Sequence, residues 1–133
     1  MAGSPVKILI VDDNETDIEI VNGMLSKATF EKDIFVVNNG EEALDFLCHT
    51  GAYTDASQYP TPDIILLDVM MPKMNGYVFV RKIKALPLLA HIPIIVFTTI
   101  KGIQDSFEIE GVEDYVLKSL DGTELLQKIS KYL

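Results

Sequence analysis

Acidic side chains directly follow two apolar runs of this chain. Asp68 follows the run Ile64 to Leu67, and Asp12 and Asp13 follow the run Val6 to Val11. A continuous apolar run of this length is typical of a strand buried on both faces. A charge inside such a strand is costly, so we expect the carboxylates at the strand ends, where the sheet meets solvent. Three carboxylates gathered at one edge of a sheet indicate a site.

The same edge is expected to carry a hydroxyl and an ammonium group. Thr98 follows the apolar run Ile92 to Phe97, and Lys118 follows the short run Tyr115 to Leu117. In open parallel sheets, ligands bind outside the carboxyl ends of the strands. Clustered carboxylates repel one another, so they favour a bound cation, and few ligands with retained waters favour Mg²⁺ over Ca²⁺. An ammonium and a hydroxyl beside a metal-bound carboxylate suit a phosphoryl group, with the carboxylate as its nucleophile.

The elements that must position these groups alternate between strand and helix about five times. This alternation predicts an α/β fold, in which a parallel sheet is covered by helices on both faces. The short second strand is predicted over Ile34 to Val37. The first helix is predicted to begin after the cap Asn14, and the second covers Glu41–Cys48 after the cap Asn39. The remaining helices are predicted over Gly76–Leu86, over Lys101–Glu110 and after the cap Asp121. The segment from His49 to Pro62 is the one long connection. We expect it at the opposite edge from the carboxylates, as a surface insertion or a partner contact.

Composition narrows the class of protein. The 133 residues are 48% hydrophobic and 23% charged, which indicates a single domain over residues 1–133 with its core from about residue 6. The net charge of -9 disfavours direct binding to nucleic acids and to anionic membranes. One cysteine excludes an intramolecular disulfide, and no apolar segment approaches the length of a membrane span. With no signal-peptide pattern at the N-terminus, we expect a cytoplasmic protein.

Four pieces of the sequence, each at a predicted strand end, resemble the receiver domain of two-component response regulators. The resemblance covers the chain from Val6 to Leu133. The pieces are Ile10-Val11-Asp12-Asp13-Asn14, Leu67-Asp68-Val69-Met70-Met71-Pro72-Lys73-Met74-Asn75-Gly76, Phe97-Thr98-Thr99 and Asp114-Tyr115-Val116-Leu117-Lys118. The resemblance implies a flavodoxin-like (CheY-like) doubly wound (βα)5 fold with strand order 2-1-3-4-5.

The resemblance also implies a metal-assisted phosphoryl acceptor. Asp68 would accept the group from a phosphohistidine of a sensor histidine kinase or a histidine phosphotransfer protein. Asp13, Asp68 and the backbone carbonyl of Met70 would bind Mg²⁺, and Asp12 would act through water. The family members are phosphoacceptor proteins rather than enzymes in the usual sense.

A switch is implied next to the acceptor. Thr98 and Lys118 would hold the phosphoryl oxygens, and Tyr115 would turn inward as Thr98 moves. The change would remodel the face built from the fourth helix, the fifth strand and the fifth helix, where a downstream protein target or a second copy in a homodimer would bind. The long connection and the prolines near residue 90 are similar to those of stand-alone receivers paired with phytochrome-type kinases.

Some positions depart from the family pattern. Ser119 replaces the usual proline after Lys118, so we expect a trans bond there. Thr99 is bulkier than the usual alanine or glycine. Met70 and Ile100 are apolar at the positions that in the family flank the attacking water, so we expect slow self-dephosphorylation.

Other functions fit the residues less well. A phosphatase of the haloacid-dehalogenase type needs a second Asp where Met70 stands. A flavin-binding module needs a phosphate loop after the first strand, and the acidic residues there would repel the phosphate. A receiver that is never phosphorylated and acts only as a binding module remains the alternative.

Overall fold

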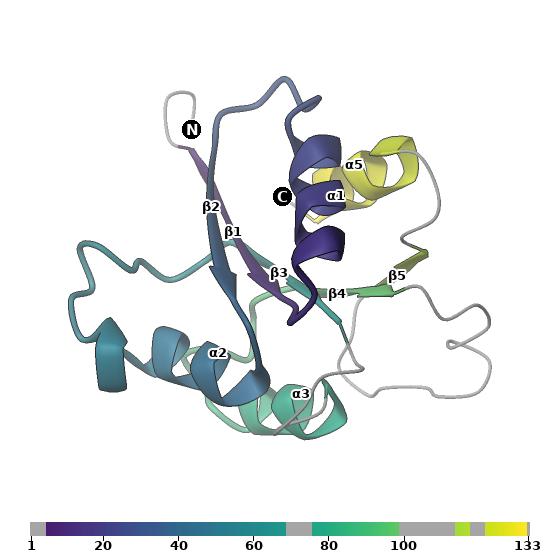
Figure 1. Ribbon diagram of the computed structural model, residues 1–133. Helices are drawn as coiled ribbons and strands as arrows, with labels where there is room; N and C mark the ends of the chain where they lie inside the picture. Colours follow the sequence, from purple (N-terminus) through teal and green to yellow (C-terminus); the bar gives the residue numbers. More distant parts are fainter. Residues whose placement is uncertain (1–4, 69–75, 99–113, 118–121, 133) are drawn as a thin grey trace.

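The computed structural model describes residues 5–68, 76–98, 114–117 and 122–132 (Figure 1). The helix predicted over residues 101–110 and the predicted cap Asp121 lie outside these ranges. No helix in the described ranges has the length and apolar character needed to cross a membrane. The elements run in the order β1 (Val6–Val11), α1 (Glu15–Leu25), β2 (Lys32–Val37), α2 (Gly40–Cys48), the 3-10 turn η1 (Gly51–Tyr53), β3 (Ile64–Leu67), α3 (Gly76–Lys84), β4 (Ile94–Thr98), β5 (Asp114–Leu117) and α5 (Gly122–Lys131).

The five strands form one parallel sheet in the order β2-β1-β3-β4-β5. This confirms the predicted fold class and strand order. Parallel strands need crossover connections, and α1, α2 and α3 provide them between β1 and β4. The sequence placed the limits of some elements wrongly: β2 begins two residues earlier than predicted, α3 ends at Lys84 instead of Leu86, and β4 begins at Ile94 instead of Ile92. Pro93 precedes β4, as expected for a residue without a backbone N–H.

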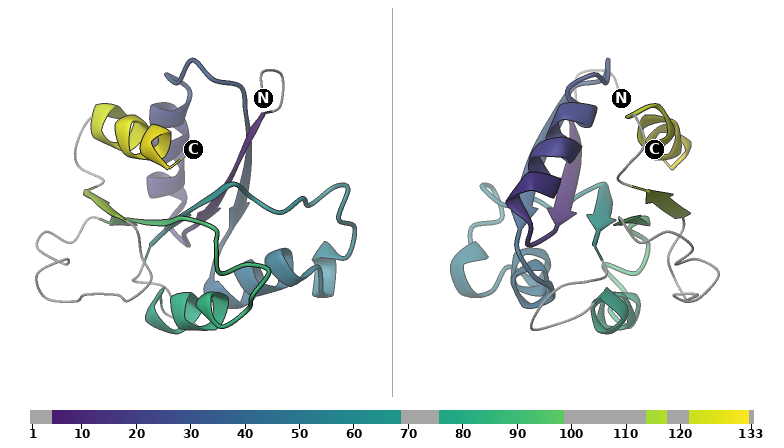
Figure 2. Two further views of the ribbon diagram at one scale, coloured as in Figure 1. Left: turned by 180° about the vertical axis from the view of Figure 1, so that it is seen from behind. Right: turned by 45° about the vertical axis from the view of Figure 1, so that its right-hand side comes forward.

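Alternate residues of the central strands point into two hydrophobic layers, one on each face of the sheet. Ile8 and Ile10 of β1 lie in the layer covered by α1 and α5, and Leu9 and Val11 lie in the layer with α2 and α3. Figures 1 and 2 show the same two pairs of helices on opposite faces. Strand β3 divides its four buried residues in the same way. The apolar runs of the sequence are therefore strands buried on both sides, as predicted.

Asparagine side chains cap the N-termini of two helices. The Oδ1 atom of Asn14 accepts a hydrogen bond from the backbone N–H of Asp17 at 3.0 Å, and Asn39 does the same for Glu42 at 2.8 Å. Both caps were predicted from the sequence. They satisfy backbone donors that have no partner within their own helix.

The long connection after α2 is packed against the core. The ring of Tyr53 lies 5.3 Å from that of Phe46 and 4.8 Å from that of Tyr59, measured between centroids. Burial and a 2.7 Å hydrogen bond from the Tyr53 hydroxyl to Glu42 raise the pKa of Tyr53 to about 12. His49 Nε2 lies 2.8 Å from the carbonyl oxygen of Tyr59. Most residues of the segment are exposed, as expected for a surface insertion, while Tyr53 and Tyr59 pack against the layer formed with α2.

Candidate functional site

The register of the two central strands brings Asp12 and Asp68 together. Val11 pairs with Leu67, so the next residue of each strand emerges at the same level of the sheet. The backbone N–H of Asp68 donates to the carbonyl oxygen of Val11 at 2.9 Å. Both carboxylates therefore lie at the carboxyl edge, where the sequence predicted them.

These two carboxylates are largely withdrawn from solvent. The exposed fraction is 2% for Asp12 and 8% for Asp68, and they are the buried polar residues among those that the structure describes. One carboxylate oxygen of Asp12 accepts a hydrogen bond from the backbone N–H of Asn14 at 3.0 Å. Burying charged groups is costly, so a pair of them at a strand edge is typical of a functional site.

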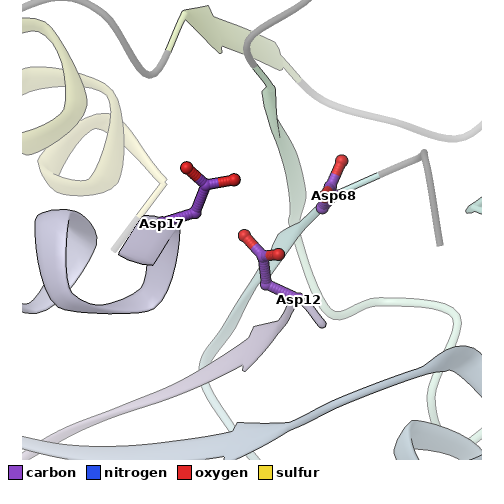
Figure 3. A group of neighbouring side chains, drawn as sticks. All are labelled: Asp12, Asp17 and Asp68. Carbon is purple, nitrogen blue, oxygen red and sulfur yellow. The ribbon is translucent and has the colours of Figure 1, made fainter. Parts of the chain in front are cut away.

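A third carboxylate, that of Asp17 in α1, completes the group. Each of Asp12, Asp17 and Asp68 offers an oxygen within 4.8 Å of the others (Figure 3). The sequence interpretation missed Asp17. It lies three residues after the cap Asn14, in the first turn of α1, where an acidic residue is ordinary and does not by itself indicate a site.

Two further residues, Asp13 and Met70, were predicted to bind the metal. Asp13 is exposed on the connection between β1 and α1, and it is not a member of the group formed by Asp12, Asp17 and Asp68. Met70 lies outside the described residues. The roles of both residues in metal binding stay predictions.

Thr98 and Tyr115, two of the residues predicted to hold the phosphoryl group or to act as the switch, lie in the neighbouring strands β4 and β5. Thr98 is the last residue of β4 and pairs with Leu117, the last residue of β5. Lys118 follows Leu117 directly in the chain and lies outside the described residues. Tyr115 lies in β5 opposite Val96. The backbone thus puts Thr98 at the edge to which the chemistry was assigned.

The negative charges of Asp12, Asp17 and Asp68 determine which kind of ligand this group can bind. At 4.8 Å, the separation that bounds this group, two unit charges repel by roughly 0.9 kcal/mol at the dielectric constant of water and about 3.5 kcal/mol at an effective value of 20. Three such pairs favour a cation at this edge. Carboxylate oxygens are the ligands that hard divalent ions prefer, so the donor set fits Mg²⁺ or Mn²⁺.

Comparisons with known proteins identify the family of this chain. Residues 8–130 match the family model of the response regulator receiver domain. Response regulator Rcp1 of Synechocystis sp. is 32% identical over 128 residues, which cover 94% of this chain and 84% of that protein. The crystal structure of the phosphorylated cyanobacterial phytochrome response regulator RcpA has a TM-score of 0.77 at 32% identity and covers 96% of this chain and 91% of that one. The crystal structure of the Mn²⁺-bound form of Rcp1 has a TM-score of 0.74 at 33% identity, with 94% and 88% covered. This chain therefore belongs to the receiver domain family of response regulators.

Proposed function

We propose that this chain acts as a cytoplasmic signalling receiver that takes a phosphoryl group on Asp68. The donor is a phosphohistidine of a sensor histidine kinase or a histidine phosphotransfer protein. The observation that carries the proposal is the placement of Asp68, buried at the carboxyl edge of the sheet and grouped with Asp12 and Asp17. Similarity to phytochrome response regulators favours a phytochrome-type kinase as the donor.

The transfer itself needs few groups. A carboxylate oxygen of Asp68 attacks phosphorus, an O–P bond forms, and the N–P bond of the phosphohistidine breaks with its electron pair left on the imidazole. Lys118 balances the negative charge of the phosphoryl oxygens, and the Thr98 hydroxyl donates a hydrogen bond to one of them. Asp12 and its partner Asn14 hold the edge in place before the donor arrives.

The carboxylates at this edge of the sheet suit a bound Mg²⁺. Asp12, Asp13, Asp68 and the backbone carbonyl of Met70 would hold it, with Asp12 acting through water. When bound, Mg²⁺ neutralises charge on the carboxylates and on the incoming phosphoryl group. Support comes from the buried oxygens of Asp12 and Asp68 and from the Mn²⁺-bound relative.

The signal then leaves by protein contact. Movement of Thr98 toward the phosphoryl group lets Tyr115 turn inward, and this shifts a two-state equilibrium on the face that includes β5 and α5. A downstream protein target, or a second copy of this chain, binds that face. Met70 and Ile100 offer the attacking water no hydrogen bond, so the phosphoryl group is lost slowly.

Intact-mass measurement tests the proposal. The protein is incubated with acetyl phosphate or phosphoramidate and Mg²⁺, and we expect it to gain the mass of one phosphoryl group. Asp68→Asn should gain none, and Asp33→Asn, which removes an exposed carboxylate of β2, should behave like the parent protein. No gain in the parent protein, or an unchanged gain in Asp68→Asn, would refute the mechanism. A parent protein that stays unmodified would then be a receiver acting only as a binding module.

A further inference from the structure

We infer that Asp17 belongs to the divalent-cation site and raises its affinity, as a carboxylate that the family pattern of Asp12, Asp13 and Asp68 does not include. The inference rests on the proposed function, because it assigns one more residue to the metal of the same site. Asp17 comes from the first turn of α1, and its carboxylate lies with those of Asp12 and Asp68 at the sheet edge (Figure 3).

The position of Asp17 is fixed by the residue that also fixes Asp12. Asn14 accepts a hydrogen bond from the Asp17 backbone N–H through its side chain, and it donates its own backbone N–H to Asp12, each at 3.0 Å. Asn14 therefore ties the end of β1 to the start of α1. The carboxylate of Asp12 and the backbone of Asp17 are therefore held in place before any ligand binds, which lowers the entropy cost of binding.

The separations suit a hydrated divalent ion. Two oxygens on opposite sides of one Mg²⁺ lie about 4 Å apart, and Mg²⁺ keeps several waters in its sites. The three carboxylates offer oxygens within 4.8 Å of one another, so Asp17 can reach a water of the ion without a change in the backbone. Two of the three carboxylates are more than nine-tenths buried, and a relative with the same fold binds Mn²⁺.

A structural role for Asp17 makes a different prediction. A carboxylate in the first turn of a helix interacts favourably with the positive end of the helix dipole, and this interaction stabilises the helix without any metal. In that case, removing the charge of Asp17 would change stability and leave metal affinity as it was.

Direct titration with Mn²⁺, read from the electron paramagnetic resonance signal of the free ion, separates the two roles. We expect Asp17→Asn to weaken Mn²⁺ binding by about 10–100-fold, the range seen for groups that support metal ligands. The matched control is Glu19→Gln, which removes the same charge from an exposed position of α1 and should change affinity less than about twofold. Circular dichroism checks that both variants are folded, and Asp17→Glu, which keeps the charge, should bind Mn²⁺ more tightly than Asp17→Asn.

The outcomes separate this inference from the proposed function. Equal affinity of Asp17→Asn and the parent protein, with binding lost in Asp68→Asn, would overturn the role of Asp17 and leave the site intact. An equal loss in Asp17→Asn and Glu19→Gln would also overturn it, because long-range charge would then be the cause. Failure of the parent protein to bind Mn²⁺ or to gain a phosphoryl group would instead refute the proposed function.

Discussion

Replacing Asp12 with Asn should make the metal-free protein more stable. The substitution removes one of three negative charges whose oxygens lie within 4.8 Å of one another. Asparagine keeps the shape of the side chain and an oxygen that accepts the hydrogen bond from the Asn14 backbone N–H. The variant therefore changes charge with little change in packing.

The size of the effect follows from the same separation. Asp12 takes part in two repulsive pairs, which together amount to roughly 2–7 kcal/mol between the limits of water and an effective dielectric constant of 20. Asp12 has other interactions in the structure, and their loss offsets part of this gain. We expect the free energy of unfolding to rise by about 1–2 kcal/mol without metal, which raises Tm by about 4–8 °C for a chain of this length.

The same substitution should reduce the stabilisation by Mg²⁺. A ligand that binds only the folded state stabilises it by RT ln(1 + [L]/Kd), so tenfold weaker binding lowers the stabilisation at saturating Mg²⁺ by about 1.4 kcal/mol. The assay is thermal unfolding followed by circular dichroism, in EDTA and in Mg²⁺ at constant ionic strength. Asp33→Asn is the control, because Asp33 is exposed on β2. A variant that is less stable than the parent protein in EDTA and gains as much from Mg²⁺ would refute the reasoning.

Three further predictions follow from other residues. Asn14→Ala removes the cap of α1 and should lower the free energy of unfolding by about 1 kcal/mol in urea titration, and no loss would show that the cap is unimportant. Because the pKa of Tyr53 is raised to about 12, the unfolded chain loses this proton first, so stability should fall as pH rises above about 10. We expect this fall in the free energy of unfolding to be about 1 kcal/mol, because the hydroxyl is partly exposed. Tyr53→Phe should show a smaller fall, and an equal fall in both proteins would contradict the assignment. Met70→Asp combined with Ile100→Lys should shorten the lifetime of the phosphoryl group at least tenfold, measured by the decay of the phosphorylated mass, whereas a parent lifetime of only seconds would contradict slow loss.

The fold could be predicted from the sequence because each signal was local. Apolar runs that are buried on both faces have few structural alternatives, and parallel strands align their carboxyl ends at one edge. Asp12 and Asp68 were found in this way. The limits of the elements were less certain, since Leu86 and Ile92 fit an apolar pattern without belonging to α3 or β4.

Asp17 could not be found by the same reasoning. It lies within a helix, where an acidic residue in the first turn is ordinary, and only the packing of α1 against the sheet brings it to the strand ends. The contacts of the 49–62 segment with α2 were not predicted, for a related reason. Its polar composition indicated a surface loop, and the contacts of Tyr53 and Tyr59 with Phe46 depend on how the segment folds back over α2.

The division of β1 and β3 between two hydrophobic layers has a mechanical consequence. Asp12 and Asp68 are continuous with strands whose buried residues are locked from both sides, so displacing either backbone would disturb both layers at once. Under the proposed function, the charge of a phosphoryl group on Asp68 would therefore be accommodated by movement elsewhere. Strand β5 is an edge strand of four residues with one neighbour, which makes its side of the sheet the easier one to move. The central strands thus form a fixed frame, and under the proposed function the locked strands would set the direction in which the signal leaves the molecule.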